Sequence, residues 1–185
     1  MYTTPLFVAS RSQIQKMLPT LQLRRKEEWQ SVYIDPITSV EWIQYPLWDY
    51  HGPGPNCLRR GNPSIEEVLA CIGSSRQDTE VAAAAYHLAN DLPGTKNNYA
   101  PLVDRLESLL STDPRDHIAR NVALAIAWSG VDHPFNHRSP TGKTIEQVNS
   151  DYRHFAALAE RSLTLKARAE AILGCSITQK STSFE

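Results

Sequence analysis

The stretches with the clearest helical pattern are residues 64–90, SIEEVLACIGSSRQDTEVAAAAYHLAN, and residues 99–128, YAPLVDRLESLLSTDPRDHIARNVALAIAW. In both, apolar residues recur at intervals of three and four, which is the spacing of one buried face of an α-helix. Small, acidic or proline residues interrupt each stretch near its middle. Each stretch therefore predicts a hairpin of two antiparallel helices.

Local signals place the ends of these helices. Ser64 and Glu67 have the spacing of a capping box, and Gly73 follows the apolar face of the first helix. A second, alanine-rich helix is predicted from near Asp78, and a third over about residues 99–110. The fourth is predicted to begin at Asp113-Pro114, with Asp as N-cap and Pro at the first helical position.

The two hairpins repeat one pattern. A shift of about 37 residues superimposes their apolar positions, among them Ile65 on Leu102, Leu69 on Leu106, Val81 on Ile118, Ala85 on Val122 and Leu88 on Ala125. This arrangement resembles HEAT-type repeats, whose period is on the order of 40 residues. The resemblance implies a mostly α fold in which two HEAT-like hairpins, residues 63–130, stack as a fragment of an α-solenoid.

The remaining segments complete a predicted single domain of 185 residues. Residues 1–62 are expected to form an irregular, aromatic-rich N-terminal cap, because Pro and Gly are frequent before residue 63. A long C-terminal helix is predicted over residues 144–174, with a capping box at Thr144 and a stop at Gly174. Residues 178–185 form a polar tail that is expected to be disordered.

Two patterns assign faces within these segments. Residues 11–31 contain a short helical pattern followed by the charged run at residues 24–28, which is typical of a solvated helix face. The C-terminal helix is predicted to bury a stripe made of Ile145, Val148, Tyr152, Phe155, Ala159 and Leu163.

The least ordinary segment is residues 41–51, EWIQYPLWDYH. Its aromatic residues could cap the open end of the helical stack, or they could present anchors to a partner, because Trp and Tyr are enriched among interface hot spots. Both readings stay open, since a cap can bury one ring and expose another. The candidate binding residues here are Trp42, Tyr45, Trp48, Asp49, Tyr50 and His51.

Composition restricts the possible partners and location. A formal charge of −1 provides no basic field for a nucleic-acid backbone, so no nucleic-acid partner is expected. No apolar run approaches the roughly 20 residues of a membrane-spanning helix, and the N-terminus has no signal-peptide pattern. Three widely spaced cysteines fit ordinary packing in a reducing compartment, so a cytoplasmic location is expected.

Potential catalytic groups are sparse. Asp132, His133 and His137 lie in a proline-containing segment without the helical spacing that brings metal ligands together. We interpret this segment as a polar loop, with a metal-dependent enzyme as the alternative reading. No catalytic residue, metal or cofactor is predicted.

Binding of another protein is the leading functional hypothesis. Helical stacks present a groove lined by the second helix of each hairpin, which here would include Glu80, His87, Asp91, Arg120 and Asn121. In size and layout the chain resembles bacterial immunity proteins that neutralise polymorphic toxins, including those of contact-dependent inhibition systems. That resemblance implies stoichiometric binding to a cognate toxin domain. Some other adaptor or regulatory scaffold is the alternative within the same class.

Overall fold

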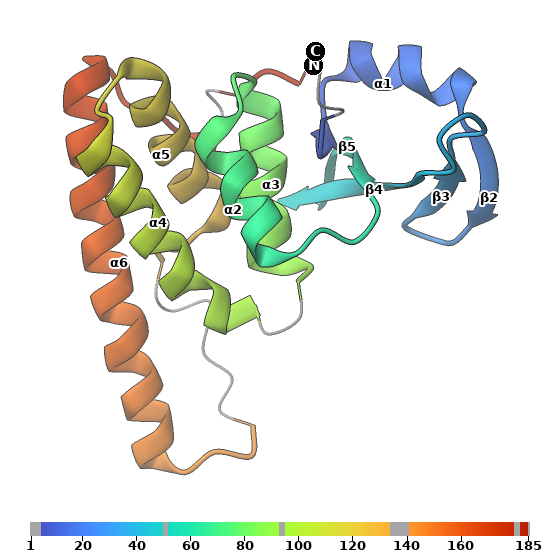
Figure 1. Ribbon diagram of the computed structural model, residues 1–185. Coiled ribbons are helices and arrows are strands. Elements are labelled where there is room, and N and C mark those ends of the chain that lie inside the picture. Colours follow the sequence, from blue (N-terminus) through green and yellow to red (C-terminus); the bar gives the residue numbers. More distant parts are fainter. Residues whose placement is uncertain (1–4, 50–51, 93–94, 134–140, 180–181, 185) are drawn as a thin grey trace.

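The computed structural model describes residues 5–49, 52–92, 95–133, 141–179 and 182–184, and it contains a sheet beside a group of helices (Figure 1). Residues 7–60 supply the sheet, and most of the remaining described chain is helical. The elements, in chain order, are β1 Phe7–Val8, α1 Arg11–Met17, the short helix η1 Leu18–Thr20, β2 Gln22–Lys26, β3 Ser31–Ile34, β4 Glu41–Asp49, β5 Gly52–Arg60, α2 Ile65–Ser74, α3 Asp78–Asn90, the short helix η2 Thr95–Asn98, α4 Tyr99–Thr112, α5 Asp116–Ser129 and α6 Ile145–Leu173.

The five-stranded sheet has the order β1-β5-β4-β3-β2, and every neighbouring pair is antiparallel. The prediction of a mostly α, HEAT-like solenoid fragment was therefore wrong: the fold is a mixed one of sheet and helices. The expectation of an irregular segment over residues 1–62 was wrong for the same reason. A sheet that packs against α3 takes the place that another helical hairpin would occupy in a solenoid.

The long hairpin of β4 and β5 was not predicted, because its prolines and glycines indicated an irregular segment. The pairing of β4 with β5 shifts register between Pro46 and Trp48, and a proline is tolerated at such an irregularity because a ladder hydrogen bond is already missing. Gly54 has a steric role, since a Cβ there would lie 2.5 Å from the Leu47 carbonyl oxygen. Only glycine allows the two strands to approach this closely.

Apolar residues on the two faces of the sheet enter different clusters. Phe7, Leu47 and Cys57 join the main core with the helices. Val8, Trp42 and Leu58 form a smaller cluster with Ile14 of α1. Successive strand residues point to opposite faces, so adjacent pairs such as Phe7 and Val8 reach different clusters. Strand β4 thus contributes Leu47 to the cluster on one face of the sheet and Trp42 to the cluster on the other.

Helices α2 to α5 occupy the two stretches with the helical pattern, and several of the predicted end signals are confirmed. The capping boxes at Ser64 and Thr144 are both formed, and Gly174 ends α6 in the left-handed conformation at φ 67°. Helix α5 begins at Asp116, with Arg115 as N-cap, instead of at Pro114 with Asp113 as N-cap. None of the helices in the described ranges combines the length and apolar character required to cross a bilayer.

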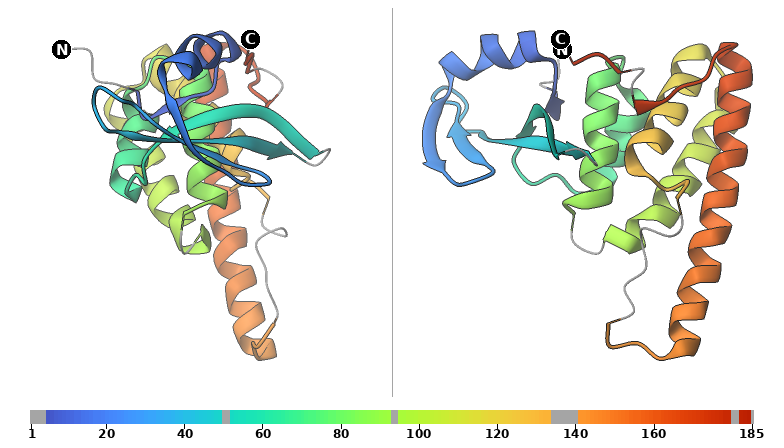
Figure 2. Two further views of the ribbon diagram at one scale, coloured as in Figure 1. Left: turned by 90° about the vertical axis from the view of Figure 1, so that its right-hand side faces the viewer. Right: turned by 180° about the vertical axis from the view of Figure 1, so that it is seen from behind.

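Helix α6 buries only part of the predicted stripe: Phe155 and Ala159 are buried as predicted. Ile145 and Leu163 are 80% and 53% exposed. Its buried residues are Phe155, Leu158, Ala159, Ser162, Leu165 and Ala169. The first turns of the helix extend beyond the body of the molecule, where no other described element covers them (Figure 2).

The described part of the C-terminal tail packs against the helices, contrary to the expectation of disorder. The Trp128 indole N–H donates to the Thr182 hydroxyl at 3.1 Å, and the Trp128 and Phe184 rings meet edge to face at 5.3 Å. The Arg11 amide donates to the Phe184 carbonyl at 2.7 Å. The tail therefore joins α5 to α1.

The reactivity of the cysteines tests how the sheet packs against the helices. Cys57 is fully buried, and burial raises the pKa of its thiol to about 12, whereas Cys175 is exposed. At pH 8 only about one in ten thousand Cys57 side chains would be thiolate, which is the reactive form. We expect iodoacetamide to modify Cys175 rapidly and Cys57 only after unfolding, as measured by peptide mass spectrometry. Rapid modification of Cys57 in the native protein would contradict the sheet packing.

Candidate functional site

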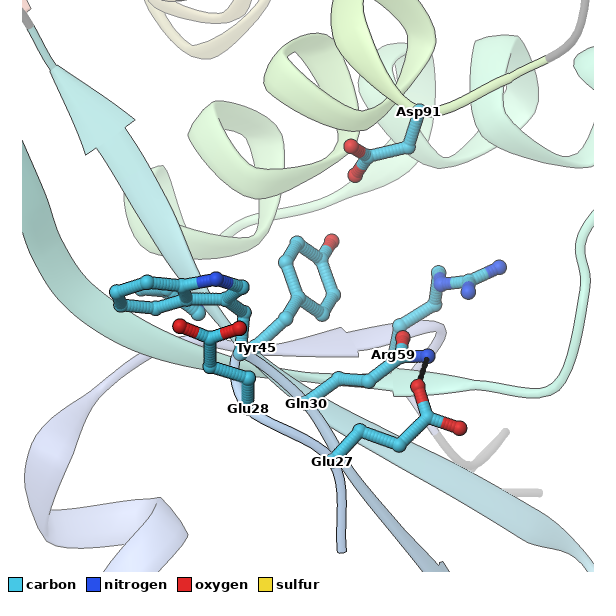
Figure 3. Close-up of a pocket in the computed structure, with 8 residues that line it drawn as sticks. Glu27, Glu28, Gln30, Tyr45, Arg59 and Asp91 are labelled. Atoms are coloured by element: carbon cyan, nitrogen blue, oxygen red, sulfur yellow. Dashed lines mark hydrogen bonds between the residues drawn. The ribbon is translucent and has the colours of Figure 1, made fainter.

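A pocket of about 500 Å³ lies where three parts of the chain meet: the turn between β2 and β3, strands β4 and β5, and the end of α3 (Figure 3). Its lining residues are Glu27, Glu28, Trp29, Gln30, Tyr45, Pro46, Arg59 and Asp91. Polar and charged side chains thus dominate a concave surface at the junction of sheet and helices, which is a common position for a binding site.

The turn from Glu27 to Gln30 forms the outer wall. The Glu27 amide donates to the Gln30 carbonyl at 2.8 Å, and the Gln30 side-chain amide donates back to the Glu27 carboxylate. Arg25 adds an ion pair to Glu27 at 2.8 Å. These contacts hold the tight turn, and Trp29 lies within it with 56% of its surface exposed.

Tyr45 forms the floor. It pairs across the sheet with Cys57, and Arg59 lies over its ring with the guanidinium carbon 5.9 Å from the ring centroid. Burial raises the pKa of Tyr45 well above its usual range, and the nearby Cys57 and Asp91 raise it further. The hydroxyl is buried and makes no hydrogen bond in the described part of the chain, although the Cys57 side chain lies close to it.

His87 and Asp91 lie one helical turn apart at the end of α3. The His87 Nδ1 is 3.0 Å from an Asp91 carboxylate oxygen, and the His87 side chain is only 1% exposed. The imidazole packs against Phe7 and Tyr45, with ring centroids 5.5 and 6.5 Å away. Its Nε2 is buried without a hydrogen-bond partner in the described part of the chain.

Three buried polar atoms therefore gather around this pocket without a partner in the described residues: Tyr45 Oη, Arg59 Nε and His87 Nε2. Leaving such a group unsatisfied costs about 1–3 kcal/mol, so a native protein normally supplies water or a ligand. Tyr45 and Arg59 also line the pocket. A polar ligand in the pocket would therefore lie close to two side chains that each have a buried atom without a hydrogen-bond partner.

The structure brings together three of the residues that the sequence nominated, namely Tyr45, His87 and Asp91. Trp42 is 1% exposed and lies in the small cluster on the other face of the sheet. Trp48 and Asp49 continue β4, and Tyr50 and His51 lie outside the described residues. Trp42 is therefore not part of the surface around the pocket.

The other nominated residues make contacts within the fold. Glu80 accepts from the Leu6 amide at 3.0 Å and from the Ser75 hydroxyl at 2.7 Å. Arg120 forms a forked ion pair with Asp78, which joins α5 to α3. Asn121 is 3% exposed and donates to two backbone carbonyls of the α2 end. These contacts give all three residues a structural role.

The segment after α5 does not assemble a metal site in the described residues. The Asp132 side chain is 8% exposed and lies 3.6 Å from the Lys166 ammonium, while His133 is 70% exposed and 3.7 Å from the same carboxylate. His137 lies outside the described residues. Within the described ranges, no group of three or more His, Cys, Asp or Glu could hold a metal ion.

Sequence reasoning missed Glu28, Trp29 and Arg59. The charged run before Trp29 was interpreted as part of a helix, whereas α1 ends at Met17 and η1 begins with Leu18-Pro19. Pro19 was the available signal, because proline is poorly tolerated inside a helix. Arg59 had no sequence signal, since its place in the pocket follows only from its pairing opposite Ile43.

No protein-family model, curated protein or solved structure matches this chain. The geometry of the fold and of the pocket therefore carries the functional conclusion.

Proposed function

We propose that this protein acts by stoichiometric binding of another protein, through a surface formed by Glu28, Trp29, Tyr45 and Asp91. The observation that carries the proposal is the half-exposed Trp29 beside an open pocket whose floor holds an unsatisfied tyrosine hydroxyl. Tryptophan and tyrosine supply a large contact area with few rotatable bonds, and they dominate interface hot spots.

The proposed partner is a cognate toxin domain. The alternative is that the protein is an adaptor or regulatory scaffold. The likeness to toxin-neutralising immunity proteins depended on the helical layout that the sheet contradicts, so it adds no support from the fold. A cytoplasmic location belongs to the same proposal, and the absence of disulfides among Cys57, Cys71 and Cys175 supports it.

The metal-dependent enzyme is a weaker alternative for this geometry. Lys166 and His133 both lie beside the Asp132 carboxylate, which is only 8% exposed. The His87 imidazole could act as a base only if a substrate reached its Nε2, which is buried behind Phe7 and Tyr45.

Replacing Trp29 by Ala should weaken the partner complex without unfolding the protein. A hot-spot tryptophan contributes about 2 kcal/mol or more, which is roughly 30-fold in Kd, mainly through faster dissociation. The partner would be co-purified from the native organism and titrated by surface plasmon resonance against each variant, with the melting temperature measured in parallel.

The matched control is Ile37→Ala, because Ile37 is 91% exposed in the turn before β4 and does not line the pocket. It should bind like the wild type. A captured protein that binds Trp29→Ala and Ile37→Ala equally well would contradict the proposed surface.

A further inference from the structure

The pocket carries an excess of negative charge. Three carboxylates line it, those of Glu27, Glu28 and Asp91, against the single guanidinium of Arg59. Arg59 is engaged, since it lies over the Tyr45 ring and donates to the Asn62 side chain at 3.0 Å. The remaining charge favours a cation.

The three carboxylates differ in whether they already contact other residues of the protein. Glu27 pairs with Arg25 and accepts from Gln30, and one Asp91 oxygen contacts His87. Glu28 makes no ion pair with any described residue, although it lines the pocket. Glu28 and the second Asp91 oxygen are therefore the acceptors that a cationic guest would meet.

A second feature points to a polar guest independently of charge. The Tyr45 hydroxyl is buried and unpartnered, and Figure 3 shows it directed toward Asp91 across the pocket. An ammonium or guanidinium group near Asp91 could donate to this oxygen and to an Asp91 carboxylate oxygen. Trp29 also lines the pocket with an aromatic ring, whose face attracts cations.

We infer that the pocket receives a basic side chain, lysine or arginine, from the partner protein; this inference rests on the proposed function. The cation pairs with Asp91, with Tyr45 as a second acceptor. Glu28 adds negative charge to the pocket, and Trp29 covers the aliphatic stem of the basic side chain. The negative lining selects against acidic side chains, because the partner's carboxylate would face like charges. It also disfavours neutral side chains, which cannot form an ion pair with the pocket.

The test uses blocked tripeptides, acetyl-Gly-X-Gly-amide, with X as arginine, lysine, glutamine or glutamate. Titrations followed by nuclear magnetic resonance should show the amides of residues 27–30, 45 and 91 shifting with arginine or lysine, at a Kd of about 1 mM, as expected for a small ligand. The stronger of the two basic peptides identifies the side chain. Equal binding of the glutamine peptide would overturn the inference.

Variants assign the effect to the pocket. Glu28→Gln and Asp91→Asn should each weaken the basic peptide about 5- to 10-fold, and Tyr45→Phe should weaken it less. Glu146→Gln serves as the charge-matched control, because Glu146 is an exposed residue in the first turn of α6 and does not line the pocket. Equal loss in the control would overturn the inference.

The same variants separate this inference from the proposed function. A captured partner that loses affinity with Trp29→Ala but binds Glu28→Gln and Asp91→Asn normally would refute the basic side chain and keep the protein-binding surface. A basic peptide that binds the pocket while no captured protein depends on Trp29 would refute the proposed function instead.

Discussion

Replacement of Trp42 by Ala is expected to destabilise the protein by about 3–5 kcal/mol, the usual cost of truncating a buried tryptophan. Trp42 is 1% exposed and is the largest side chain of the small cluster with Val8, Ile14 and Leu58. That cluster lies between the sheet and α1. Loss of the Trp42 ring therefore removes the largest apolar contact between α1 and this face of the sheet. Urea unfolding followed by circular dichroism measures the change.

Trp29→Ala is the matched control for Trp42→Ala. The substitution is the same, but Trp29 is 56% exposed, and surface changes usually stay within about 0.5 kcal/mol. Hydrogen exchange adds a second readout: in Trp42→Ala, the amides of β3 and β4 should lose protection before those of α3 and α5. Equal destabilisation by both substitutions would show that Trp42 does not support the sheet.

The contrast between these two tryptophans also shows where sequence reasoning ends. Both precede or enter a strand, and nothing in their immediate neighbours distinguishes the core ring from the exposed one. Burial depends on the pairing of β4 with β3 and β5, which places Trp42 opposite Tyr33 and Arg60. Such pairings join residues far apart in the chain, so no local pattern specifies them.

The helices were more predictable because their signals are local. A capping box spans four residues, and an apolar face repeats within one or two turns, so Ser64, Thr144 and Gly174 could be assigned correctly. The internal repeat is a similarity of apolar spacing in the sequence, and it does not specify what packs beside the helices. Its extension to a solenoid failed because the sheet covers α3.

The candidate site was predictable only in part. His87 and Asp91 were nominated as the polar face of a helix, and their spacing of four residues does bring them into contact. Tyr45 was nominated as an aromatic anchor, and it lies beside them. The outer wall was missed because a short charged strand, β2, lacks the apolar alternation by which strands are recognised.

Replacement of Asn121 by Ala is the second substitution expected to have a large effect, at about 2–4 kcal/mol. The Asn121 amide donates to the carbonyls of Ile72 and Ser75, each at 2.9 Å. The last carbonyls of a helix have no partner within it, so this side chain of α5 satisfies the end of α2. Removal leaves two acceptors unsatisfied at a buried site and opens a small cavity.

A variant of nearly the same shape separates hydrogen bonding from volume. Asn121→Asp fills the same space, but its carboxylate cannot donate and would face two carbonyl oxygens, so it should destabilise at least as much as Asn121→Ala. Asn149→Ala, an exposed position on α6, is the control and should change the free energy of unfolding little. If Asn121→Ala instead kept full stability and lost partner binding, Asn121 would be a binding residue, as its position on the second helix of a hairpin first suggested. One denaturant titration and one binding titration distinguish the two outcomes. If Asn121 only joins α5 to α2, its replacement must lower the free energy of unfolding, and any loss of partner binding follows from that loss of stability.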